Sequence, residues 1–155
     1  MKLSAISEKL QESLKPHFKS EGFKKKRAAW GLVSEELGKL FNIQCSQFGR
    51  SVYFNMGIYL QTEGKVQFPR EVDCHLRLRV EQILASKEEI GNFYNLSNFE
   101  NCYSINDRVE ELTEIILEKA IPWFREFNSI SDIKKSHNVA STMYWNYGKE
   151  ILEKL

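Results

Sequence analysis

The segment "LFNIQCSQFGRSVYFNMGIYL", Leu40–Leu60, contains two runs in which apolar and polar residues alternate. The first run covers residues 40–48 and the second covers residues 51–60, and apolar residues stand at every second position from Phe41 to Cys45 and from Val52 to Leu60. A period of two is typical of a β-strand with one buried face. The tetrapeptide "FGRS", Phe48–Ser51, separates the runs and favours a turn. The segment therefore predicts a β-hairpin with one apolar and one polar face.

The same period predicts two further strands outside the hairpin. One is the short run Ala28–Val33, and we expect residues 35–38, "EELG", to form the turn after it. The other is "DCHLRLRV", residues 73–80, where polar and apolar residues again alternate. Together these runs predict a mostly antiparallel sheet of about four or five strands. Its buried face would be lined by Phe41, Ile43, Phe54, Met56, Ile58, Leu76 and Leu78.

Apolar residues spaced three and four apart predict helices on both sides of these strands. In the N-terminal helix these residues are Leu3, Ile6, Leu10, Leu14 and Phe18. We expect a second helix over residues 104–127, a third from Ser141 to Leu155, and mostly loop with one short helix over residues 87–102. The predicted fold is a single α+β domain, residues 1–155, in which two or three C-terminal helices pack on one face of the sheet.

The composition limits the classes of protein that are possible. The chain has 155 residues, of which 42% are hydrophobic and 28% are charged, as in an ordinary globular protein. We find no apolar run of about 18 residues, and the N-terminus becomes polar within a few residues, so we expect no membrane segment and a cytoplasmic location. The three cysteines are widely spaced, which favours reduced thiols over disulfides or a zinc site. We expect no metal and no cofactor.

Sequence motifs give no support for an enzyme. The chain has no phosphate-binding glycine loop, no nucleophile elbow and no HExxH metal motif, and its three histidines fall on different predicted elements. The basic run "KKKR", Lys24–Arg27, is the strongest local charge. Because side chains alternate along an extended chain, at most two of its cations share a face, whereas strong nucleic-acid binding neutralises about six or more phosphates. Nucleic-acid binding through this run is therefore the weakest functional hypothesis.

The polar face of the predicted sheet is the candidate binding site. It combines amides, phenols and arginines, which make directional hydrogen bonds and are common at interfaces. Arg77 and Arg79 point the same way and can hold a carboxylate or phosphate between them. Two alternatives remain open: an internal polar network under residues 81–104 or against the acidic helix, and a catalytic site with His75 as general base. The candidate residues are Gln44, Tyr53, Asn55, Tyr59, His75, Arg77 and Arg79.

Four segments carry a resemblance to a known family. They are "LKPHFKSEGFKKKRAAW" (14–30), the hairpin, "HLRLRV" (75–80) and "IPWF" (121–124). In this order they resemble the bacterial domain-of-unknown-function family DUF4304, over residues 3–127. The resemblance implies a small cytoplasmic α+β protein without an established activity. Families of this kind are sometimes encoded near secreted toxins, which suggests a non-catalytic, immunity-like module that binds a protein partner. The alternative is a small-molecule or anion-binding protein, or a hydrolase, that uses the polar face.

Overall fold

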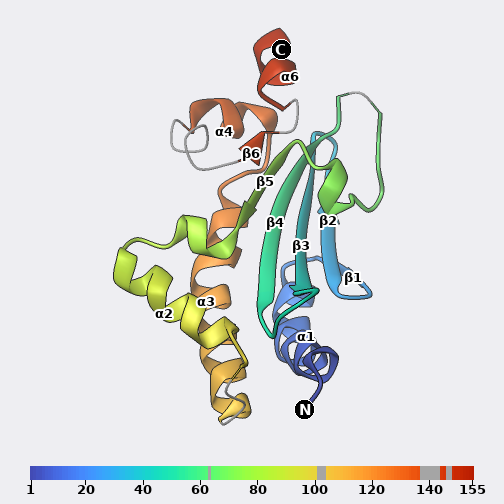
Figure 1. Ribbon diagram of the computed structural model, residues 1–155. Coiled ribbons are helices and arrows are strands. Elements are labelled where there is room, and N and C mark those ends of the chain that lie inside the picture. Colours follow the sequence, from blue (N-terminus) through green and yellow to red (C-terminus); the bar gives the residue numbers. More distant parts are fainter. Residues whose placement is uncertain (63, 101–103, 137–143, 146–147) are drawn as a thin grey trace.

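The computed structural model describes residues 1–155 except 63, 101–103, 137–143 and 146–147. The described chain begins with a helix, continues as a sheet and ends in further helices, with its two termini at opposite ends (Figure 1). The elements are α1 (Leu3–Ser20), β1 (Lys24–Lys26), β2 (Ala29–Val33), β3 (Leu37–Cys45), β4 (Val52–Leu60), η1 (Glu71–Asp73), β5 (Leu76–Arg79), η2 (Val80–Ile83), α2 (Lys87–Ser97), α3 (Ile105–Arg125), α4 (Ile130–Lys135), β6 (Tyr144–Trp145) and α6 (Gly148–Lys154).

The sheet is an antiparallel meander in the order β1-β2-β3-β4-β5-β6. Its centre is the predicted hairpin, in which Phe41 pairs with Met56. The sheet begins with a strand that the sequence pattern did not predict, β1. The turn before β3 also lies one or two residues earlier than predicted. Ser34 closes it, because its N–H donates to Leu37 O (2.7 Å) and its Oγ accepts from the Leu37 N–H (3.2 Å).

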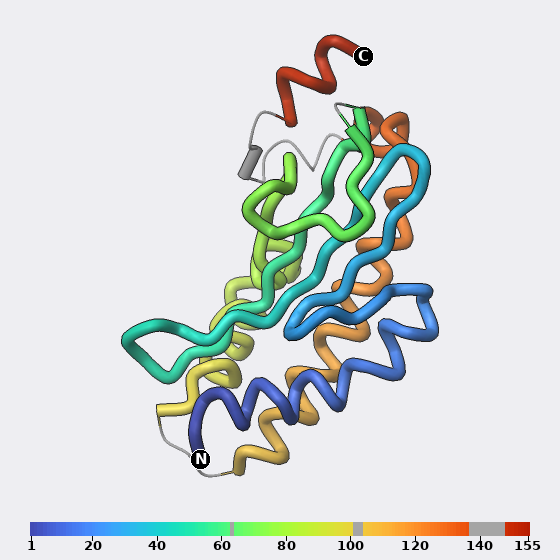
Figure 2. The backbone as a smooth tube through the Cα atoms, turned by 90° about the vertical axis from the view of Figure 1, so that its right-hand side faces the viewer, coloured from blue at the N-terminus to red at the C-terminus, as the bar shows by residue number. Residues whose placement is uncertain are grey.

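Helices α1, α2 and α3 cover one face of the sheet, which we call the inner face (Figures 1 and 2). All seven side chains predicted for the buried face are at most 6% exposed. The prediction of an N-terminal helix, an antiparallel sheet and C-terminal helices packed on one face is confirmed. The chain is an α+β protein.

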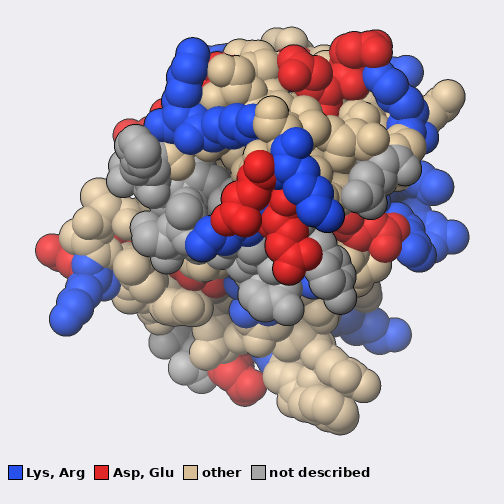
Figure 3. Space-filling view, turned by 90° about the horizontal axis from the view of Figure 1, so that it is seen from above, with Lys and Arg blue, Asp and Glu red and all other residues tan. Residues whose placement is uncertain are grey.

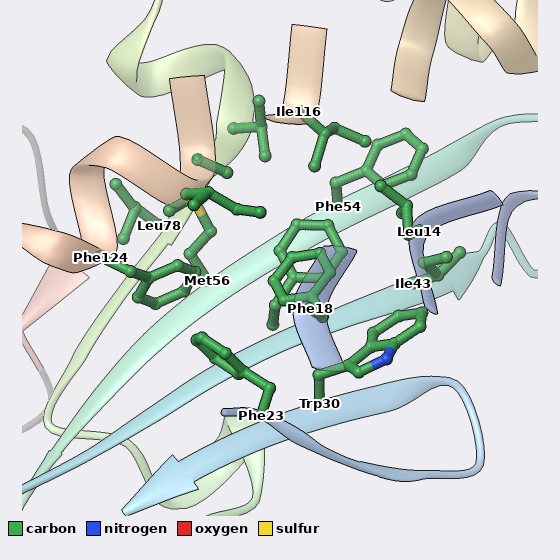
Figure 4. Packing of buried hydrophobic residues seen from close by; sticks show 14 of the residues in the cluster. Leu14, Phe18, Phe23, Trp30, Ile43, Phe54, Met56, Leu78, Ile116 and Phe124 are labelled. Carbon is green, nitrogen blue, oxygen red and sulfur yellow. The ribbon is translucent and has the colours of Figure 1, made fainter. Parts of the chain in front are cut away.

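Aromatic rings fill the space between α1 and the inner face (Figure 4). Phe18 of α1 is fully buried, and its ring centroid lies 5.1 Å from that of Phe23, 5.2 Å from Trp30 and 4.8 Å from Phe41. Phe54 continues the series on β4, 6.2 Å from Phe41. Ring contacts at these distances add to the hydrophobic gain from burying each side chain. Phe18 therefore joins α1 to three separate parts of the chain.

A buried lysine joins the sheet to the end of α3. Lys39 on β3 is 8% exposed, and its Nζ donates to the main-chain oxygen of Phe124 at 2.6 Å. The last carbonyls of a helix have no partner within the helix, so this ammonium group satisfies one of them. Burial lowers the pKa of Lys39, while the nearby carboxylates of Asp132 and Glu21 act in the opposite direction.

The C-terminal part of the chain differs from its prediction. A helix was predicted from Ser141 onward, but residues 144–145 form strand β6, which pairs with β5, and helix α6 begins only at Gly148. The N–H and C=O groups of residues 144–145 bond to the open edge of β5 instead of within a helix. Tertiary contacts therefore override the helical spacing of the apolar residues here. The remaining residues of this prediction, 141–143 and 146–147, lie outside the described residues.

Candidate functional site

Half of the sheet's other face, the outer face, is covered by the segment between β4 and β5 (Figure 2). We call residues 61–75, apart from residue 63, the covering segment. Three glycines lie beneath it. A Cβ atom at Gly57 would be 2.7 Å from Cys74 Sγ, and one at Gly31 would be 3.1 Å from the Phe68 ring. A Cβ at Gly38 would lie 3.2 Å from Pro69. Glycine inside a strand thus allows the covering segment to approach the backbone closely.

Two predicted site residues, His75 and Tyr59, lie at the root of the covering segment. His75 is 8% exposed, and its Nδ1 accepts a hydrogen bond from the Leu60 N–H (2.9 Å). Its ring centroid is 4.7 Å from that of the partly exposed Tyr59. The expectation that His75 projects from an open polar face is therefore corrected: the imidazole is buried and bonded to the main chain. One alternative placed the polar face under residues 81–104. In the structure the segment that covers part of this face is residues 61–75 instead.

Arg77 and Arg79 share the outer face, but they have different partners. Arg77 forms a two-pronged ion pair with Glu71, with Nε 2.8 Å from Oε1 and Nη2 2.9 Å from Oε2. This carboxylate belongs to the covering segment and not to the acidic helix. The Arg79 guanidinium instead stacks on Tyr53, with 4.1 Å from Cζ to the ring centroid. Both arginines line the uncovered part of the face, but the Arg77 guanidinium is occupied by Glu71, so the two do not hold one group between them.

The uncovered part of the outer face has a floor of linked amides. Asn55 Nδ2 donates to Asn42 Oδ1 and to Gln44 Oε1, both at 2.9 Å, and Asn55 Oδ1 accepts from Arg79 Nε at 3.4 Å. These bonds occupy the side-chain oxygens of Asn42 and Gln44. Their NH₂ groups have no acceptor among the described residues. The floor therefore presents hydrogen-bond donors.

Two hollows meet over this floor. The first, of about 330 Å³, is bordered by cations from the β1–β2 turn and by Phe68. The second, of about 680 Å³, lies against Gln44, Asn55 and Arg79. Both are walled by Glu71 of the covering segment. We call the combined depression the outer-face trough. It crosses the strands from β1 to β5.

The basic run does not act as one patch. In the β1–β2 register Lys24 and Lys26 lie opposite Gly31 and Ala29, on the outer-face side, whereas Lys25 lies opposite Trp30, on the inner-face side. The alternation predicted for these lysines is confirmed. Lys26 reaches the trough, with Nζ 5.8 Å from the Phe68 ring centroid. The run therefore supplies cations to two different surfaces.

Other site types find little support in the described part of the chain. Outside the gaps given above, no group of three or more His, Cys, Asp or Glu side chains is placed to hold a metal ion. Within the same described residues, no helix is both long and apolar enough to cross a membrane. The described cysteines, Cys45 and Cys74, are free thiols, and Cys102 lies outside the described residues.

Cys74 should be inert to alkylation in the folded protein. It belongs to the covering segment, its side chain is fully buried against β4, and burial raises its pKa to about 12. Because only the thiolate reacts, we expect iodoacetamide at pH 8 to leave Cys74 unmodified in the native state and to modify it in urea, as measured by peptide mass spectrometry. Because the pKa of Cys74 is higher in the folded state, its protonated thiol contributes to the free energy of unfolding. This contribution is complete below pH 9 and is lost as the pH rises toward 12. Rapid native labelling would contradict the burial.

The architecture defines the class of protein: a helix-backed antiparallel sheet with a donor-rich trough on its free face. The chain belongs to the family described as Domain of unknown function (DUF4304), whose family model matches residues 14–126. The resemblance noted from the sequence is thereby confirmed, over a span that starts within α1 and ends just after α3. The matched span contains the whole trough and excludes β6 and α6. No curated protein and no solved structure matches the chain.

Proposed function

We propose that this protein is a non-catalytic binding module, a single domain that holds an extended, acceptor-rich segment of a partner protein in the outer-face trough. The observation that carries the proposal is the exposed donor floor, where the NH₂ groups of Asn42 and Gln44 lie beside the Arg79 guanidinium. The amides of a solvated sheet face can bond to water alone and do not need to bond to one another, as Asn42, Gln44 and Asn55 do here. Four strand spacings give the trough a length of roughly 19 Å, enough for about five or six extended residues.

The charge around the trough favours a partner segment with carboxylates. Cations stand at both ends, Lys26 and Arg27 at one and Arg79 at the other. The acid in the wall, Glu71, is already neutralised by Arg77. An acidic side chain entering the trough would therefore meet donors and the cations at its two ends, and charge complementarity of this kind promotes association and selects partners.

We further propose an immunity-like role in the cytoplasm, with a toxin domain as the partner. The family resemblance supports the immunity-like role. The free thiols Cys45 and Cys74 support the cytoplasmic location, because thiols stay reduced in that compartment. The hydrolase alternative is weakened by His75, because a buried imidazole whose Nδ1 accepts a main-chain N–H is poorly placed as a general base. The nucleic-acid alternative is weakened by the division of Lys24–Lys26 between two surfaces.

Substituting Arg79 tests the proposal. The Arg79→Gln variant, combined with Gln44→Ala, should weaken partner binding by about thirtyfold or more, since truncating a central arginine anchor typically costs about 2 kcal/mol. The measurement is quantitative affinity capture from the native cell, followed by titration of the captured partner. Lys134→Gln removes an exposed charge from α4 and serves as the matched control. Equal capture by the double variant and wild type, or the absence of a stoichiometric protein partner, would overturn the proposal.

The second candidate is a small anion in the same trough, favoured by the 680 Å³ hollow beside Arg79. A thermal-shift screen with phosphorylated metabolites separates it from protein binding, because a bound ligand raises the apparent stability. A rise in Tm that Arg79→Gln removes would favour this candidate. A screen without such a response would leave protein binding as the better explanation.

A further inference from the structure

A third hollow, of about 450 Å³, lies on the other side of β1, between α1 and the β1–β2 hairpin. Two lysines one turn apart on α1 border it on one side, and two lysines of β1 border it on the other. Gly22, with a φ of 93°, sits in the turn after α1 and allows β1 to fold back along the helix. We call this site the lysine hollow. Its lining includes Lys15, Lys19, Lys24, Lys25, Phe23 and Trp30.

The positive charge of the lysine hollow is not compensated within the described part of the chain. Lys15, Lys19 and Lys24 have no ion-pair partner among the described residues. Lys25 Nζ donates only to neutral oxygens, those of Gln11 (3.0 Å) and of the Arg27 main chain. The nearest acid that follows α1, Glu21, is paired with Arg125.

The surface at the opposite end of the molecule is different. Viewed from the end that carries α4 and α6, acidic and basic side chains are interspersed (Figure 3). Ion pairs also accompany other surface cations, as at Lys65 with Glu35 and Arg70 with Asp73. Lysines that border one hollow without an ion-pair carboxylate among the described residues repel one another, and an anion bound between them would remove that repulsion.

We infer that the lysine hollow binds the pyrophosphate or triphosphate group of a small molecule. Ammonium groups are compact, strongly hydrated charges that suit phosphate oxygens. Several of them around one hollow suit a multiply charged group better than a singly charged carboxylate. The volume falls within the range typical of small-molecule sites. The floor is formed by the buried rings of Phe23 and Trp30, and Lys25 Nζ stands 5.6 Å from the Trp30 ring centroid. Apolar walls of this kind reduce the screening of the charges above them.

The geometry favours a compact ligand over a nucleic-acid strand. Strand binding typically neutralises about six or more phosphates along an extended groove. Here the lysines border a single hollow, and the neighbouring cations Lys26 and Arg27 border the outer-face trough instead. The lysine hollow is therefore independent of the proposed partner site.

Calorimetric titration of the full chain with sodium tripolyphosphate tests the inference. We expect one binding site per chain and a rise in Tm. The Lys15→Gln/Lys19→Gln double variant should lose about tenfold or more of the affinity, because it removes two charge-assisted contacts. The matched control, Lys134→Gln/Lys149→Gln, removes the same charge from exposed positions on α4 and α6 and should bind as wild type does. Arg79→Gln should also bind normally, which separates this site from the trough.

Three results would overturn the inference: no binding to wild type, equal affinity in the Lys15→Gln/Lys19→Gln variant, or tighter binding of a single-stranded oligonucleotide that also depends on Lys26 and Arg27. A second readout does not require the variants to fold. In ¹H–¹⁵N spectra of wild type, tripolyphosphate should shift the Trp30 indole signal, which lies in the floor, and leave the Trp123 signal on α3 unchanged. An unmoved Trp30 signal at saturation would also count against the site.

Discussion

Replacing Phe18 by alanine should lower the free energy of unfolding by about 3–5 kcal/mol, the usual cost of deleting a buried aromatic ring. Phe18 is fully buried, and its ring contacts Phe23, Trp30 and Phe41, so the cavity would open at the point where α1 meets the sheet. Two of the surrounding rings, Trp30 and Phe41, belong to paired strands and cannot collapse into the space without breaking the strand register. Urea denaturation followed by circular dichroism measures the change.

Phe48 provides the matched control for this loss. It lies in the β3–β4 turn and is 94% exposed, so Phe48→Ala should change the free energy of unfolding by no more than about 0.5 kcal/mol. The same atoms are removed in both variants, and only the environment of the ring differs. Comparable losses in the two variants would show that α1 does not pack on the sheet as described.

Gly57→Ala should destabilise the protein by about 1–3 kcal/mol, although alanine is ordinarily no worse than glycine within a strand. The added Cβ would lie 2.7 Å from Cys74 Sγ and 3.0 Å from Cys74 Cβ. Because β4 is paired on both sides, the covering segment has to move instead of the strand. Thermal and urea denaturation of the purified variant measure the loss.

Gly91→Ala is the corresponding control. Gly91 lies within α2, and nothing stands within 4 Å of a Cβ added there, so alanine should stabilise the protein by about 0.5–1 kcal/mol. Adding Cys74→Ala to Gly57→Ala removes the closest atom and should restore part of the loss. If Gly57→Ala instead proved neutral or stabilising, the close contact between Gly57 and Cys74 would be wrong.

Alternation over residues 40–60 was sufficient to predict the hairpin and its buried face. The pattern is dense there, and each apolar position contributes to one contiguous core. Alternation also correctly placed Gln44, Tyr53, Asn55, Arg77 and Arg79 on the other face of the sheet. Asn42 belongs to the same alternation, but its place in the amide floor follows from the Asn42–Asn55 register, which depends on the exact length of the turn.

The covering segment could not be predicted in the same way. Its residues have no regular period, and its position depends on contacts with Gly31, Gly38 and Gly57, each of which is far in sequence from the residue that it contacts. The glycines themselves were the available signal, because a glycine inside a strand often marks a close approach of another chain segment. Without that segment, alternation alone predicts a uniformly open polar face with His75 at the surface. The open part of the face is the smaller trough centred on Asn55 and Arg79.

The order of the strands has a consequence for how the molecule assembles. From β1 to β5 every strand pairs with the one that precedes or follows it in the chain, so each pairing closes only a short loop at a small entropic cost. Contacts of low sequence separation favour rapid folding. The meander can therefore grow outward from its central hairpin, whereas β6 must return from far along the chain to reach β5. The trough involves only strands β1 to β5, so a nascent chain would complete the proposed binding surface before β6 docks.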